Sequence, residues 1–240
     1  MRTISRVAGL SAIVFALASL AWFIFELVPP SLGFEDTDSP AVSIAFVRAH
    51  PDIPLFAGLC LIVMSISLTV AILGIAEVTA PRGGSMALRC LSAFGLFAAA
   101  FFLVSGGLKV GASGPLLHIA GLRQERGEAA YLVAQVAGQA LLISGIVGLC
   151  LWAAGLSLIG RRMRILPFWL CLLGIVPAIR LAGGTLGPLV VLPDSELLWI
   201  LGMVSIPGTM AWCLLLGLVL LGRGLASTAE HGVVAVPAGD

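Results

Sequence analysis

Hydrophobic residues gather in six long runs along this chain, and short polar segments separate the runs. A helix that rises about 1.5 Å per residue needs about 20 apolar residues to cross about 30 Å of hydrocarbon. Each run supplies about that number or more, so we predict an all-α integral membrane protein with six transmembrane helices. The runs are Val7–Val28, Ile53–Val78, Met86–Lys109, Ala129–Gly160, Ile165–Gly183 and Leu197–Leu221.

The two longest polar breaks, Pro29–Asp52 and Val110–Glu128, are too short to enclose a core of their own. Within the first break, Pro40–His50 has the spacing of a short amphipathic helix at the membrane interface. This helix either caps a cavity or is a connector resting on lipid headgroups, and we favour the connector.

The fourth and fifth runs depart from a simple span. The fourth is longer than a bilayer requires, so its helix is tilted or extends past the outer surface. Its small residues recur every four positions, as in Ala130, Ala134 and Gly138, which favours close packing on neighbouring helices. The fifth contains Pro177 and then the segment Gly183–Pro188, so we predict that the fifth helix is broken near its outer end.

Composition agrees with a chain that is almost entirely membrane domain. It is 60% hydrophobic and 10% charged, whereas a soluble domain has about a quarter charged residues. We therefore predict one six-helix transmembrane domain over residues 1–222. Ser, Thr, Gly and Pro accumulate after Arg223, so residues 223–240 are predicted to be a disordered cytoplasmic tail.

Charge is distributed unequally over the two predicted faces of the membrane, and short loops rich in Lys and Arg stay in the cytoplasm. One face has eight basic residues and three acids, and the other has five basic residues and nine acids. This bias predicts cytoplasmic N- and C-termini. The first apolar run continues to Val28, long enough to span, so we expect it to be retained as a helix. The eight are Arg2, Arg6, Arg82, Arg89, Arg161, Arg162, Arg164 and Arg223.

Five polar residues fall in the outer half of the predicted spans, where leaving a charge in lipid costs at least about 2.5 kcal/mol. We expect Arg180 to turn inward toward a carboxylate or amide, and Glu26 is the nearest acid at similar depth. In one interpretation all five line an outward-open pocket for a small anionic or polar ligand. In the other they serve structure alone, through snorkelling and interhelical hydrogen bonds. The five are Glu26, Lys109, Gln135, Gln139 and Arg180.

Motifs for catalysis are not found in the sequence. His50 and His118 fall in external loops and His231 in the tail, so they form no haem or zinc pattern. No nucleotide-binding glycine motif and no basic stripe for nucleic acid occurs. The five cysteines lie in or beside apolar runs, where Cys packs as a small hydrophobic residue. We therefore lean against an enzyme and assign no cofactor, no metal and no nucleic-acid partner.

A hairpin motif gives the chain one resemblance to a known family. Leu142–Gly183 combines a glycine-rich apolar helix, the basic turn Gly160–Arg164 and the stretch Leu166–Gly174, which begins Leu-Pro. In this hairpin, and in length and layout, the chain resembles bacterial membrane proteins of the domain-of-unknown-function 4386 family. The resemblance implies six helices and a long first outer loop. It implies no activity and no functional residues.

Three functions remain open from the sequence, and a membrane enzyme that acts on lipid is the least favoured of them. The first, which we prefer, is a non-enzymatic binding or accessory subunit, or a regulator, of a membrane assembly. Its partners would be membrane lipids and another membrane protein or a second copy of the chain. Short loops and small-residue stripes favour it. The alternative is a small-solute transporter or permease that uses the outward-facing polar cluster.

Overall fold

The computed structural model describes residues 2–33, 39–79, 86–163, 166–181 and 196–232, and every regular element in them is a helix. Five of these helices are long and apolar enough to cross a membrane, which supports the predicted all-α membrane class. The helices are α1 Arg2–Ser31, α2 Pro40–Ala49, α3 Asp52–Thr79, α4 Met86–Ala112, α5 Pro115–Leu122, α6 Gln124–Arg162, α7 Phe168–Leu173, α8 Ile175–Ile179 and α10 Glu196–Gly232.

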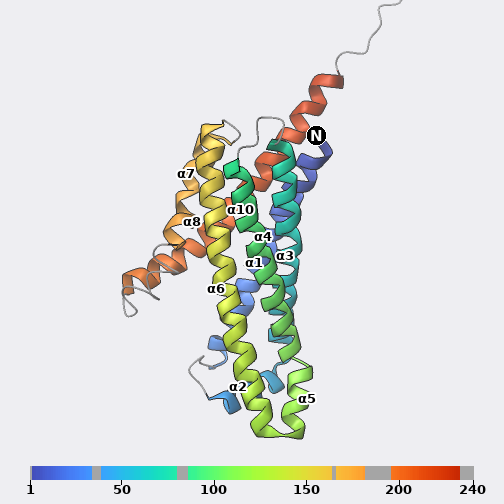
Figure 1. The fold of residues 1–240 in the computed structure, drawn as a ribbon, viewed down its shortest axis with the longest axis vertical. Helices are drawn as coiled ribbons and strands as arrows, with labels where there is room; N and C mark the ends of the chain where they lie inside the picture. The colour runs from blue at the N-terminus through green and yellow to red at the C-terminus, as the bar shows by residue number, and fades with distance from the viewer. Residues whose placement is uncertain (1, 34–38, 80–85, 164–165, 182–195, 233–240) are drawn as a thin grey trace, which may run out of the picture.

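The long helices form a bundle in which each packs on its neighbours (Figure 1). Helix α1 packs between α10 and α3, α3 packs on α4, and α4 packs on α6. The short helices α7 and α8 contact both α6 and α10 and so close the ring. Aromatic side chains fill its centre: the Phe15 and Phe102 rings lie 6.5 Å apart, and Trp152 meets Trp212 edge-on at 5.9 Å.

Glycine pairs set the closest helix crossings. A Cβ placed on Gly58 of α3 would lie 2.7 Å from the carbonyl oxygen of Gly106 on α4, and the reverse distance is also 2.7 Å. Gly9 of α1 and Gly217 of α10 face each other in the same way, at 2.8 and 2.7 Å. Because lipid tails are as apolar as Leu, such close backbone packing is a main source of helix association in membranes.

Within the described residues 166–181, the fifth run forms two short helices. Helices α7 and α8 meet at Gly174, which packs directly on Ser157 of α6. Together they cover Phe168–Ile179, which is shorter than a membrane span requires. The break that we predicted at Gly183–Pro188 lies outside the described residues. The irregularity that is observed comes earlier, because Gly174 and Pro177 both weaken the helix there.

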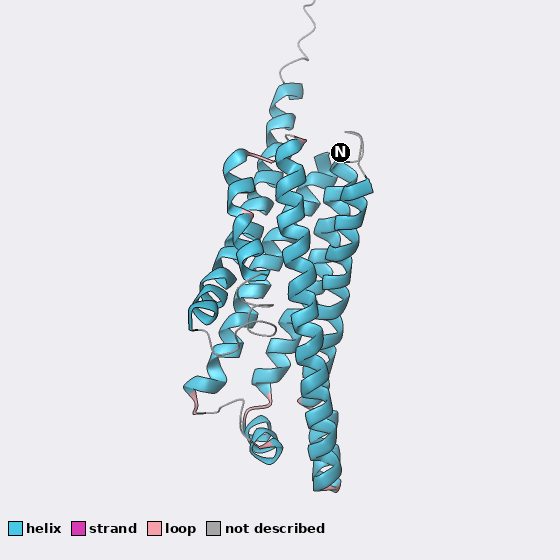
Figure 2. Cartoon of the chain, turned by 60° about the vertical axis from the view of Figure 1, so that its left-hand side comes forward, coloured by secondary structure: helices cyan, strands magenta, loops and turns pink. Residues whose placement is uncertain are grey.

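Helix α2 lies against the bundle instead of resting beside it. Ser39 caps its first turn by accepting a hydrogen bond from the backbone N–H of Val42, and Pro40 occupies the first helical position. Ser43, Ile44 and Val47 are buried, and α2 contacts α6. The connector interpretation that we favoured is therefore wrong, because the apolar face of α2 packs on protein. In Figure 2 α2 lies across one end of the bundle.

The fourth run is long, as predicted, and α6 has 39 residues, or about 58 Å at the usual helical rise. Figure 1 shows its first turns, paired with α5, projecting past α1 and α3. Helix α10 is also longer than its run and continues to Gly232. The prediction of a disordered tail is therefore wrong for residues 223–232, where no proline interrupts the helix; residues 233–240 lie outside the described part.

The first turn of α1 and the last turn of α10 lie at the same end of the bundle (Figure 1). The start of α4, with Arg89, and the end of α6, with Arg161 and Arg162, share that end. Basic residues that are far apart in the sequence are thus gathered at one end. This is the arrangement that the charge bias requires, and the side of the membrane stays a prediction.

Candidate functional site

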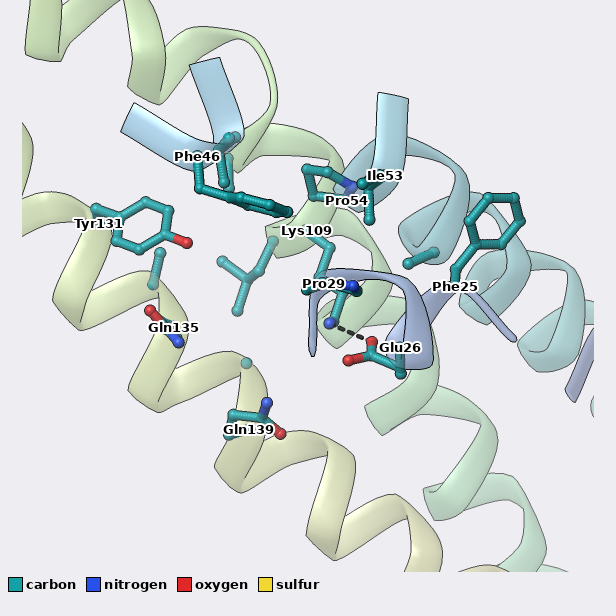
Figure 3. Close-up of a pocket in the computed structure, with 16 residues that line it drawn as sticks. Phe25, Glu26, Pro29, Phe46, Ile53, Pro54, Lys109, Tyr131, Gln135 and Gln139 are labelled. Atoms are coloured by element: carbon teal, nitrogen blue, oxygen red, sulfur yellow. Dashed lines mark hydrogen bonds and ion pairs between the residues drawn. The ribbon is translucent and has the colours of Figure 1, made fainter. Parts of the chain in front are cut away.

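A pocket of about 120 Å³ opens near the end of the bundle that α2 covers. Figure 3 shows its side chains, which come from five helices. Phe46 and Val47 of α2 form its cover, and Ile53, Pro54 and Ala57 supply the α3 wall. The amphipathic helix of the first loop is therefore part of the pocket, which is the alternative that we had ranked second.

An ion pair between α1 and α4 provides the charge in this pocket. The Nζ atom of Lys109 lies 2.5 Å from Oε1 of Glu26 (Figure 3). The two side chains remain 24% and 31% exposed, so water or a ligand can reach both. Their charges cancel, and the lysine retains further N–H donors for another acceptor.

The wall opposite the ion pair belongs to α6 and is polar. Tyr131, Gln135 and Gln139 are spaced four residues apart, so they lie along one helix face (Figure 3). Gln135 is half-buried and Gln139 is exposed. Each amide offers both a donor and an acceptor, so this wall can meet either kind of polar group. The prediction from the sequence named both glutamines but missed Tyr131, whose position one turn before Gln135 was the available signal.

Arg180 lies apart from the other four predicted residues. It is 7% exposed and lines a second, smaller cavity of about 20 Å³ between α1, α3, α4, α6 and α10. Glu26 is not its partner, because that carboxylate pairs with Lys109. Within the described part of the chain no carboxylate forms an ion pair with Arg180. The structure thus brings Glu26, Lys109, Gln135 and Gln139 together and leaves Arg180 in a separate site.

The chemistry that the pocket offers is hydrogen bonding and charge. No three His, Cys, Asp or Glu side chains among the described residues gather closely enough to hold a metal ion. The described side chains that line the pocket include no Ser, Cys or His, and its titratable groups are Glu26, Lys109 and Tyr131. The arrangement can therefore hold and orient a polar molecule, with a Lys ammonium, a carboxylate and amides as the recognising groups.

Comparison with known proteins leaves the pocket as the main guide to function. No family model, no curated protein and no solved structure matches the chain. The resemblance to the domain-of-unknown-function 4386 family therefore stays a prediction that rests on the hairpin residues alone.

Proposed function

We propose that this chain is a six-helix bacterial inner-membrane protein that binds a small zwitterionic molecule in the pocket beneath α2, without transforming it. The observation that carries this proposal is the half-buried Glu26–Lys109 pair inside a pocket that is otherwise walled by apolar side chains, two amides and the Tyr131 hydroxyl. A ligand with one ammonium and one carboxylate can interact with both members of the pair. It leaves no net charge in a region where an uncompensated charge is costly.

The size of the pocket limits the ligand. An apolar cavity of about 150 Å³ can hold benzene, so about 120 Å³ fits a molecule of about six non-hydrogen atoms. The smallest α-amino acids have this size and charge pattern. The aromatic ring of Phe46 in the cover can also contact the ammonium group of such a ligand.

The accessory-subunit hypothesis now has less support than it had from the sequence. It rested on the short loops and on the stripes of small residues. In the structure Gly145 and Gly148 of α6 meet Phe102 and Phe94 of α4, and the other close glycine contacts are also between helices of this chain. These small residues therefore serve the bundle itself.

The transporter hypothesis has one observation in its favour. The small cavity beside Arg180 lies about one helical turn deeper than the pocket on two of the shared helices. On α1 the lining changes from Glu26 to Trp22, and on α6 it changes from Gln139 to Leu142. The pocket and the small cavity thus follow one another along the bundle axis, as successive binding sites on a transport pathway would.

A binding measurement tests the proposal. Purified protein in detergent would be heated with a panel of small α-amino acids, and with uncharged amides of similar size. We expect at least one zwitterion to raise the melting temperature saturably, because a ligand that binds only the folded state stabilises it. Glu26→Gln and Lys109→Met should each abolish that shift.

Glu77→Gln provides the matched control, because Glu77 is an exposed acid near the other end of α3. It should leave the ligand-induced shift unchanged. The proposal fails if no zwitterion in the panel gives a saturable shift, or if the shift survives in both pocket variants.

Reporter fusions test the six-helix topology. Fusions after Arg82 and Arg164 should report the cytoplasm, and fusions near Asp38 and Arg123 should report the exported side, because the basic segments remain inside. The result after Arg164 is the decisive one. An exported signal there would mean that the chain crosses the membrane an odd number of times before Arg164.

A further inference from the structure

We propose that the small cavity beside Arg180 binds a monatomic anion of the size of chloride, held by the Arg180 guanidinium and the Trp22 indole N–H. This site is separate from the pocket beneath α2, and the inference does not depend on what that pocket binds.

The charge of Arg180 creates the need for an anion. Its side chain is 93% buried, at the end of the broken segment formed by α7 and α8. Moving a charge of this size from water into a protein interior costs several kcal/mol unless an opposite charge or good hydrogen bonds compensate for it. The lining of the cavity contains no Asp or Glu, so the described side chains around it supply no countercharge.

Trp22 supplies a second donor on the lining of the same cavity. Its side chain is 8% exposed and lines the cavity, and its Nε1 atom has no hydrogen-bond acceptor among the described residues. A buried indole N–H usually has a partner, as Trp212 does in donating to the Leu170 carbonyl at 3.2 Å. A buried donor without an acceptor, on the wall of a small cavity that the Arg180 guanidinium also lines, indicates that the acceptor is a ligand.

The size of the cavity selects among possible acceptors. A volume of about 20 Å³ is close to the minimum for one water molecule, so carboxylate or phosphate ligands are too large. Water would satisfy hydrogen bonds but would leave the positive charge in place. The hydroxyls of Ser19 and Thr209 also line the cavity, but they donate to the carbonyls of Phe15 and Ser205. Arg180 and Trp22 are therefore the donors for the anion.

Halide dependence of the melting temperature tests this site. Purified protein would be heated in sodium gluconate in which chloride or bromide replaces gluconate at constant ionic strength, because gluconate is too large for the cavity. We expect a saturable rise in melting temperature with either halide. Trp22→Phe keeps an aromatic ring and removes one hydrogen-bond donor to the anion. It should therefore raise the half-saturating halide concentration about tenfold. Arg180→Met should abolish the response.

Two variants separate this site from other effects. Trp212→Phe removes a buried indole N–H that already has an acceptor, so it should lower the melting temperature and leave the halide response unchanged. The double variant Glu26→Gln/Lys109→Gln removes both charges of the larger pocket and should also leave the response unchanged.

The proposal is overturned if the wild-type protein melts at the same temperature in halide and gluconate. It is also overturned if Trp22→Phe responds to halide like the wild type. This test does not require that Arg180→Met folds. Loss of the response in the Glu26→Gln/Lys109→Gln variant would place the anion in the other pocket and would equally reject the site at Arg180.

Discussion

Gly106→Leu is expected to lower the free energy of unfolding by about 3 kcal/mol, or the melting temperature by about 10 °C. A Cβ at this position would lie 2.7 Å from the carbonyl oxygen of Gly58 and 3.0 Å from the Leu61 side chain. The nearest obstacle is backbone, so the two helices would have to separate along their whole crossing. Thermal unfolding of the purified protein in detergent measures the change.

Gly107→Leu is the matched control, because Gly107 is the next residue on the same helix and a Cβ there meets nothing within 4 Å. Both substitutions gain the same helix propensity, roughly 0.8 kcal/mol over glycine. We expect Gly107→Leu to melt at or slightly above the wild-type temperature. Equal melting of the two variants would contradict the tight α3–α4 crossing.

Arg180→Met should raise stability in halide-free buffer by about 2 kcal/mol. The expectation from the sequence was the reverse, because removing one member of an ion pair strands the other. In the structure the described residues hold no carboxylate that would be stranded. Methionine is apolar, nearly as long and unbranched, so it fills the space without a desolvated charge, and replacing buried charges in this way is often stabilising.

The reference for this measurement is Arg180→Lys, which keeps a positive charge and loses the planar fork of donors. It should melt no higher than the wild-type protein in the same buffer. If Arg180→Met melts well below both, the guanidinium makes stabilising contacts of its own, and the buried charge is not a net cost.

The helices were predictable because hydrocarbon imposes a simple rule on sequence. Any segment that crosses it must satisfy its own backbone, so long apolar runs such as Ile53–Val78 become helices with nearly the predicted limits. The end of α10 was not predictable in this way. Beyond Arg223 the sequence is polar, and neither its composition nor its hydropathy distinguishes a continuing helix from a tail.

The candidate site was only partly predictable, because the depth of a residue in the membrane does not determine which neighbouring helix its side chain faces. Glu26, Lys109 and Arg180 were placed at similar depths, and nothing in the runs says which pair faces each other. The pairing follows from α1 packing between α3 and α10, which brings Glu26 toward α4 and places Arg180 across the ring. The sequence analysis did not identify Trp22 as a site residue, because a tryptophan within an apolar run is usually a core residue.

The crossing of Gly58 and Gly106 lies beside the pocket, since Ala57, next to Gly58, and Lys109, one turn after Gly106, line it. The backbones of α3 and α4 are already in contact at this crossing, so these two helices cannot move closer together. The α3–α4 wall of the pocket is therefore rigid. On α6, by contrast, a Cβ at Gly138 would meet Leu108 only at 3.9 Å. We therefore expect the movement that admits a ligand to come from α6 or from the covering helix α2, and a crosslink between α2 and α6 to slow ligand entry.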